Sequence, residues 1–236
     1  LDTSYCVPLL RETTGRPVVT VTVDTGGIDA EAAASLERRA RALGAAAHHL
    51  VDGREALFRD VLRFLIMGNV RRGGTYPLCV GAERGVQARE VAAAAARLGS
   101  RTVAHGCTAA GNDQIRFEVA LRTLRPDLEI LAPVRDAPCP REKQEQYLLA
   151  RSLPVPPSGA AYSINRGLWG VTIGGRETLG SAECIGESAW VLTRGAFDAP
   201  PPPARHRVGF ERGVPVSLDG ERLAPVPLLE RLEPLA

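Results

Sequence analysis

Hydrophobic and polar residues follow two patterns along the first two-thirds of the chain. Short apolar or β-branched runs predict buried strands, and these runs lie at residues 17–24, 45–50, 101–104 and 128–132. Longer stretches with apolar or alanine residues at helical spacing predict helices, and these lie at residues 29–43, 54–70, 87–98 and 141–151. Strands that alternate with helices are typical of α/β folds, so we expect a parallel sheet with helices on both faces.

Turn and cap residues refine this picture. Asp29 can cap the helix that follows it, and Gly44 can end that helix. The proline-rich stretch 153–157 breaks both helices and strands, so we expect one domain at residues 1–153 and a second at 154–236. Alternation around Asp219-Gly220 predicts a type I′ hairpin in the second domain, which we expect to be smaller and of the α+β class.

Composition limits the classes of function. The net charge is +2, so it provides no argument for a nucleic acid or a membrane surface as partner. The number of cysteines is five, which is odd, and no two form a Cys-x-x-Cys pair, so we expect a reduced cytoplasmic protein without a metal site. No apolar run approaches 18 residues and no signal peptide is visible, so we expect no membrane span.

The stretch with most chemical information is residues 104–118, AHGCTAAGNDQIRFE. It predicts a strand end, a small polar loop and a helix that Asn112 can cap. Asn112 and Arg116 are four residues apart and would share a helix face beside Asp113. A helix N-terminus attracts anions, so these side chains indicate a site for an anionic ligand.

The segment HGCTAAGNDQIRFE resembles the HGxTGKGNDQxRFE motif of argininosuccinate synthases. The resemblance implies a Rossmann-like PP-loop fold and a ligase that joins citrulline to aspartate while ATP is cleaved to AMP and pyrophosphate. It also implies that Mg²⁺ accompanies the ATP. The family has Gly-Lys where this chain has Ala109-Ala110.

Other segments extend the resemblance over nearly the whole chain. Residues 1–4, LDTS, resemble the end of the family's SGGLDTS phosphate loop, whose first three residues we expect upstream of Leu1. Residues 76–78, YPL, and residues 162–173, YSINRGLWGVTI, resemble two further family segments. In the residues that follow the first of these segments the family has serine at position 81 and alanine at position 83. Within the second segment it has Asp-Glu-Asn at residues 165–167.

The resemblance implies three sets of ligand-binding residues, and the reaction requires no covalent nucleophile. ATP would contact Asp2, Thr3, Ser4, Val23, Asp24 and Gly106. L-Aspartate would contact Thr108, Asn112 and Asp113. Citrulline or a related acceptor would contact Tyr76, Asn112, Arg116, Ser163 and Thr172. The family also implies a homo-oligomer with a nucleotide-binding first domain and a partial synthetase-like second domain.

Three alternatives remain open at the level of sequence. Because Gly81 lacks a hydroxyl and Glu83 adds a carboxylate that could repel an acidic acceptor, the ligase could use an acceptor other than citrulline. Because the motif lysine is replaced, a relative that binds nucleotide or a partner protein without catalysis is a second hypothesis. A sulfur-transfer ATP pyrophosphatase is a third, because Cys107 lies in the motif loop, although a buried structural role is more common for cysteine.

Overall fold

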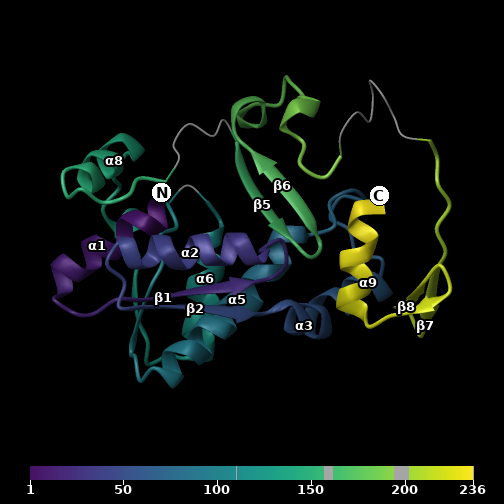
Figure 1. The fold of residues 1–236 in the computed structure, drawn as a ribbon, viewed down its shortest axis with the longest axis horizontal. Helices are drawn as coiled ribbons and strands as arrows, with labels where there is room; N and C mark the ends of the chain where they lie inside the picture. The colour runs from purple at the N-terminus through teal and green to yellow at the C-terminus, as the bar shows by residue number, and fades with distance from the viewer. Residues whose placement is uncertain (110, 157–161, 194–201, 236) are drawn as a thin grey trace. The chain divides into compact units, whose positions relative to one another are not determined.

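The computed structural model describes residues 1–109, 111–156, 162–193 and 202–235 (Figure 1). The chain divides into two compact units. Unit 1 comprises Leu1–Asp24, Ile28–Gly53 and Arg84–Gly159, and unit 2 comprises Thr25–Gly27, Arg54–Glu83 and Ala160–Ala236. Within the described ranges, no helix has the length and apolar character needed to cross a membrane.

The strands of unit 1 form two parallel pairs. β1 (Val19–Asp24) pairs with β2 (Ala47–Asp52) from Val19 opposite Ala47 to Asp24 opposite Asp52, and the two strands run side by side in Figure 1. β3 (Thr102–Ala104) pairs with β4 (Glu129–Leu131) in the same sense. These four strands match the runs that the sequence predicted, and their parallel pairing confirms the expected α/β class.

The helices of unit 1 pack on these strands and on one another in hydrophobic clusters. They are α1 (Asp2–Thr14), α2 (Ala30–Ala42), the later part of α5 (Cys79–Arg97), α6 (Asp113–Leu124), α7 (Pro133–Asp136) and α8 (Arg141–Leu149). One cluster joins α5 and α6 to β3 through Ala92, Leu121 and Val103. A second cluster joins α1, α2 and α8 through Val7, Leu43 and Leu148, and a third joins α1 to α7 through Leu10 and Val134.

Two predicted helix ends have different outcomes. The carboxylate of Asp29 accepts a hydrogen bond from the Ala32 amide at 2.8 Å and caps α2, as predicted. Asn112 occupies the residue before α6, but its side chain makes no capping hydrogen bond, so that prediction is wrong. The physical reason is its backbone, which is already helical (φ −78°, ψ −14°), whereas a capping side chain needs an extended backbone to reach the first amides.

The structure corrects the expected start of one helix and shows a buried face on another. α5 begins at Cys79 rather than near residue 87, because Cys79, Glu83 and Val86 are buried at helical spacing on one face. α8 is not only a solvated surface helix, since Gln144 is 1% exposed and Leu148 is fully buried. Charged residues around Gln144 and Leu148 hid this buried face of α8 in the sequence pattern.

Unit 2 contains helices and antiparallel strands. Its helical segments are α3 (Arg54–Leu57), a π-helical segment (Phe58–Leu62), α4 (Arg63–Met67), α9 (Pro225–Leu232) and short 3₁₀ turns at Arg176–Leu179, Glu187–Ala189 and Glu233–Leu235. Its strands are β5 (Ser163–Gly167), β6 (Gly170–Gly174), β7 (Val208–Glu211), β8 (Val214–Leu218) and β9 (Glu221–Arg222). Asp219 and Gly220 have φ of 49° and 88°, as the predicted type I′ turn requires.

We expect Leu148→Ala to lower the free energy of unfolding by about 2–5 kcal/mol, because it removes a fully buried side chain from the core between α1, α2 and α8. Leu149→Ala is the matched control, since Leu149 is the next residue of α8 and is 64% exposed. Urea unfolding of the two variants and the parent chain measures the difference. Equal stabilities of the two variants would contradict the assignment of this core.

Candidate functional site

The candidate site is built around the loop of residues 105–109, which connects β3 to α6. At Gly106 this loop approaches the first turn of α1. A Cβ atom at position 106 would lie 2.8 Å from the Thr3 nitrogen and 3.0 Å from the Asp2 carbonyl carbon. The structure therefore brings together Gly106, Asp2 and Thr3, three residues of the predicted ATP set, and it needs a glycine for this approach.

The N-terminus of α1 is suited to binding an anion. The first amides of a helix have no intrahelical partner, so they can donate hydrogen bonds to an anion. The carboxylate of Asp2 accepts a hydrogen bond from Gln144 Nε2 at 2.9 Å, and Gln144 also donates to the Cys139 carbonyl at 2.9 Å. Gln144 thus holds the only acidic group of the first turn, a role that the sequence pattern of α8 did not indicate.

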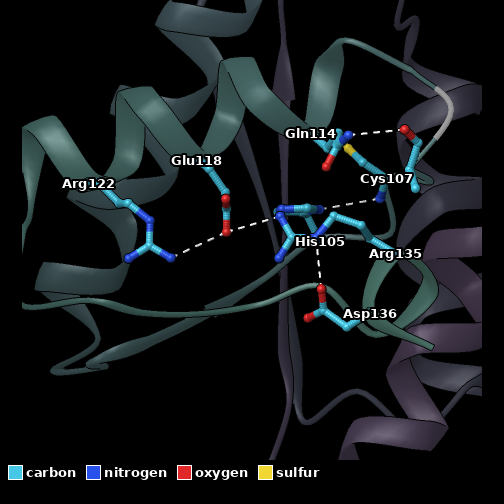
Figure 2. A network of polar contacts seen from close by, with 8 residues as sticks. His105, Cys107, Gln114, Glu118, Arg122, Arg135 and Asp136 are labelled. Atoms are coloured by element: carbon cyan, nitrogen blue, oxygen red, sulfur yellow. Dashed lines mark hydrogen bonds and ion pairs between the residues drawn. The ribbon is translucent and has the colours of Figure 1, made fainter.

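Several polar side chains of the 104–118 stretch hold the loop itself (Figure 2). Nδ1 of His105 accepts a hydrogen bond from the Cys107 amide at 3.3 Å, and the His105 ring stacks on Phe117. Gln114 Nε2 donates to the Ala109 carbonyl at 3.1 Å. Both ends of the loop are therefore fixed by side chains of the same stretch. Ala110, which stands where the related motif has lysine, lies outside the described residues.

Glu118 connects α6 to α7. Its carboxylate lies 3.0 Å from Arg135 Nη1 and 3.4 Å from Arg122 Nη2, and Arg135 also contacts Asp136 at 2.8 Å (Figure 2). The hydrogen bond from Arg135 is the main cause that lowers the pKa of Glu118. Glu118 therefore has a structural role, because its ion pair with Arg135 attaches α6 to α7.

Asp113 lies between two guanidinium groups. Its carboxylate is 3.0 Å from Arg84 Nη2 and 2.8 Å from Arg116 Nη1. Burial raises the pKa of Asp113, but the hydrogen bonds and charges of Arg84 and then Arg116 outweigh it and leave the pKa lowered. Asp113 is therefore ionised at neutral pH. The predicted aspartate-binding residues Thr108 and Asn112 are exposed near the start of this helix.

Val23 and Asp24 form the carboxyl end of β1, as predicted. Asp24 is 6% exposed, and its carbonyl accepts a hydrogen bond from the Gly53 amide at 2.8 Å. In the parallel register Asp24 pairs with Asp52 of β2, so both strands end at the same level. The carboxyl edge of a parallel sheet is where α/β proteins bind nucleotides.

The predicted acceptor residues are divided between the two units. Asn112 and Arg116 belong to unit 1, whereas Tyr76, Ser163 and Thr172 belong to unit 2. In the β5–β6 hairpin Thr172 pairs with Asn165, and Ser163 is two residues from Asn165, so Ser163 and Thr172 share one face.

Tyr76 lies in a segment that is attached to the same hairpin. The Tyr76 hydroxyl accepts a hydrogen bond from the Val80 amide at 3.4 Å. Trp169, at the hairpin turn, donates from Nε1 to the Pro77 carbonyl at 2.9 Å. Unit 2 thus joins the segment of Tyr76 to the hairpin of Ser163 and Thr172.

Glu83 is buried in unit 2 and does not face solvent. It is 3% exposed, and its Oε2 accepts a hydrogen bond from Thr25 Oγ1 at 3.2 Å. The expected repulsion of an acidic acceptor stays a prediction, because burial reduces the solvent screening of a charge and does not remove its field. Charge at position 83 could be read from the sequence, but its burial depends on residues distant in the chain.

Cys107 has the properties of a structural cysteine. It is half-buried, and burial is the main cause that raises the pKa of its thiol, followed by the negative charge of Asp113. A raised pKa keeps the thiol protonated, whereas sulfur transfer needs a thiolate. The electrostatics of the loop therefore disfavour a nucleophilic role for Cys107.

Comparison with known proteins gives a consistent result over the whole chain. A family model described as "Arginosuccinate synthase N-terminal HUP domain" matches residues 1–154. Argininosuccinate synthase from Methanocaldococcus jannaschii is 35% identical over 236 residues, which are 100% of this chain and 59% of that protein. Those from Rubrobacter xylanophilus and Xanthomonas axonopodis pv. citri are 36% and 38% identical, again over 100% of this chain and 57% of theirs. The chain thus spans less than two-thirds of the length of these relatives.

We expect His105 to titrate below its usual pKa of about 6.5. Burial and then the positive charge of Arg135 lower the pKa of His105, and its Nε2 is buried without a hydrogen-bond partner among the described residues. The unfolded chain therefore takes up the proton first, and stability falls as the pH drops through 6.5. Urea unfolding at several pH values measures this loss, which should be smaller in His105→Gln. The same loss in both proteins would contradict the prediction.

Proposed function

The chain belongs to the argininosuccinate synthase family, and on that premise we propose that it is part of an ATP-dependent carbon–nitrogen ligase. The proposed reaction joins citrulline, or a related ureido acceptor, to L-aspartate and releases AMP and pyrophosphate. The matched relatives carry the name argininosuccinate synthase, and the chain covers 57–59% of their length. The activity is therefore proposed for the whole protein to which these residues correspond.

The close approach of Gly106 to the first turn of α1 is the observation that carries this proposal. We propose that the phosphates of ATP bind at this helix end, against the amides near Thr3 and Ser4. The hydrogen bond from Gln144 to the Asp2 carboxylate supports this, because it occupies the acidic group nearest to this helix end. Val23 and Asp24, at the end of β1, are proposed to contact the nucleoside part.

When bound, ATP would activate the ureido oxygen of the acceptor as a leaving group, and Mg²⁺ would accompany its phosphates. Among the described residues, no group of three or more His, Cys, Asp or Glu side chains is arranged to hold a metal ion. We therefore propose that the phosphates provide most of the Mg²⁺ ligands, as Mg²⁺ often retains water and phosphate oxygens. The protein's own contribution is positional, because correct orientation of two bound reactants can supply roughly 7–11 kcal/mol.

We propose that L-aspartate binds near the N-terminus of α6. The ionised carboxylate of Asp113 can accept hydrogen bonds from the ammonium group of the substrate, while Arg84 and Arg116 hold that carboxylate in place. Thr108 and Asn112 are exposed and can donate to the carboxylates of the substrate. This arrangement would bind an amino acid with two acidic groups through both its positive and its negative ends.

For the acceptor we propose the hydroxyl groups of Tyr76, Ser163 and Thr172, together with Asn112 and Arg116. The common face of Ser163 and Thr172 supports this for the amino-acid end of the acceptor. The acceptor could still differ from citrulline, because Gly81 provides no hydroxyl. We also propose a cytoplasmic homo-oligomer, and the five free cysteines fit a reducing compartment.

The first prediction of this proposal is that pyrophosphate release from Mg-ATP requires both citrulline and L-aspartate. The full-length protein is the sample, and omission of each amino acid in turn is the control. If pyrophosphate release depends on L-aspartate but requires a ureido acceptor other than citrulline, that other acceptor is the substrate. ATP binding without pyrophosphate release under any combination would contradict the ligase and favour a nucleotide-binding relative.

The second prediction is that Gly106→Ala weakens Mg-ATP binding by about tenfold, equivalent to about 1.4 kcal/mol. The added methyl group would meet the backbone of Asp2 and Thr3, so the loop or the helix end must shift. Gly85→Ala is the control, because a Cβ at that helical position has no atom within 4 Å. Calorimetric titration of both variants provides the test, and unchanged affinity of Gly106→Ala would place the phosphates elsewhere.

A further inference from the structure

We propose that Glu83 is a positioning residue that locks the turn Thr25–Gly27 to the turn of the β5–β6 hairpin. The lock itself is a property of unit 2, to which all these residues belong. Its expected effect on nucleotide and acceptor binding rests on the proposed function. Glu83 would act through the two turns, without touching either ligand.

The first part of the lock is a hydrogen bond between buried side chains. Glu83 is 3% exposed and Thr25 is 4% exposed, and Thr25 Oγ1 donates to Glu83 Oε2 at 3.2 Å. Glu83 lies in the first turns of α5, whereas Thr25 directly follows β1. A buried carboxylate is costly unless it is hydrogen-bonded, so this geometry is strongly favoured over one that breaks the bond.

The second part of the lock is the space that Gly167 leaves for the Glu83 carboxylate. A Cβ atom at position 167 would lie 2.7 Å from Cδ of Glu83 and overlap its Oε1. The φ of Gly167 is not in the left-handed region, so its backbone could accommodate an L-residue. Position 167 therefore needs a glycine because a side chain would collide with the Glu83 carboxylate, and not because of its backbone conformation.

The third part joins the two turns directly through their backbones. The Leu168 amide donates to the Thr25 carbonyl at 2.7 Å. Gly26 has φ of 108°, and a Cβ at this position would lie 2.7 Å from the Cα of Leu168. Gly26 thus allows the backbone of its turn to approach Leu168, while Gly167 makes room for the Glu83 carboxylate.

The lock connects two regions that the proposed function uses. The turn Thr25–Gly27 directly follows Val23 and Asp24, which are proposed to contact the nucleoside. In the hairpin register, Gly167 shares its face with Ser163 and Thr172, which are proposed to bind the acceptor. Loss of the lock should therefore weaken binding of both ligands, while the rate at saturation changes less.

The test is a set of four variants of the full-length protein: Glu83→Ala, Gly167→Ala, the double variant and Glu83→Gln. Hydrogen exchange of peptides that contain the Leu168 amide measures the lock without any ligand. We expect at least tenfold faster exchange in Gly167→Ala and in Glu83→Ala. The double variant should match Glu83→Ala, because the added methyl group no longer meets a carboxylate. Glu83→Gln should stay within threefold of the parent, because its amide oxygen can accept from Thr25.

Mg-ATP affinity and the KM for the acceptor provide the second readout. In Glu83→Ala we expect the Mg-ATP affinity to fall about tenfold and the KM for the acceptor to rise about tenfold, while kcat falls less than threefold. Gly85→Ala, on the same helix with no atom near its Cβ, controls for substitution in α5. If Gly167→Ala does not fold, Thr25→Val replaces it, since it removes the hydroxyl donor and should reproduce Glu83→Ala.

Two outcomes would overturn the inference: parent-like exchange in Glu83→Ala, or additive effects of the two substitutions in the double variant. Absence of Mg-ATP binding by the parent protein, with the expected exchange pattern, would overturn the proposed function and leave the lock established. Normal ligand affinities in a Glu83→Ala protein with fast exchange would overturn the positioning role.

Discussion

The close approach of Gly106 to the first turn of α1 is the constraint on which the candidate site depends. Gly106 lies against the first turn of α1 because no side chain separates the two backbones. The helix end provides partial positive charge and unpaired amides. Gln144 of α8 donates a hydrogen bond to the Asp2 carboxylate, so the acidic group of that turn is already paired. The proposed anion-binding position would therefore depend on backbone geometry rather than on a cluster of basic side chains.

The remaining polar residues of this region maintain that contact. His105 and Gln114 fix the loop from its two ends, and Glu118 ties α6 to Arg135 of α7. Asp113 is held between Arg84 and Arg116, which keeps it ionised and oriented. The polar residues of the 104–118 stretch thus divide into two groups. His105, Gln114 and Glu118 hold the loop and its helix, whereas Thr108 and Asn112, two predicted ligand contacts, are exposed.

In unit 2 a different principle positions the turns. Glu83 is buried, accepts a hydrogen bond from Thr25 and occupies the space left by Gly167, whereas the sequence indicated only an added carboxylate near the acceptor. Trp169 adds a hydrogen bond to Pro77, which attaches the hairpin turn to the segment of Tyr76. The hairpin that carries Ser163 and Thr172 is therefore oriented by contacts at its turn, away from the hydroxyl groups themselves.

By itself, the sequence determined what depends on neighbours along the chain. The β-branched run of β1, the Asp29 cap and the Asp219-Gly220 turn follow from local spacing and backbone preference, and the structure confirms all three. The 104–118 stretch likewise placed the candidate site, because its residues are contiguous. Tertiary structure alone decided the partners of Asp2, Asp113 and Glu83, namely Gln144, Arg84 and Thr25. These partners lie far apart in sequence, and whether a carboxylate faces solvent, a ligand or a buried hydrogen-bond donor depends on which distant segment the fold packs against it.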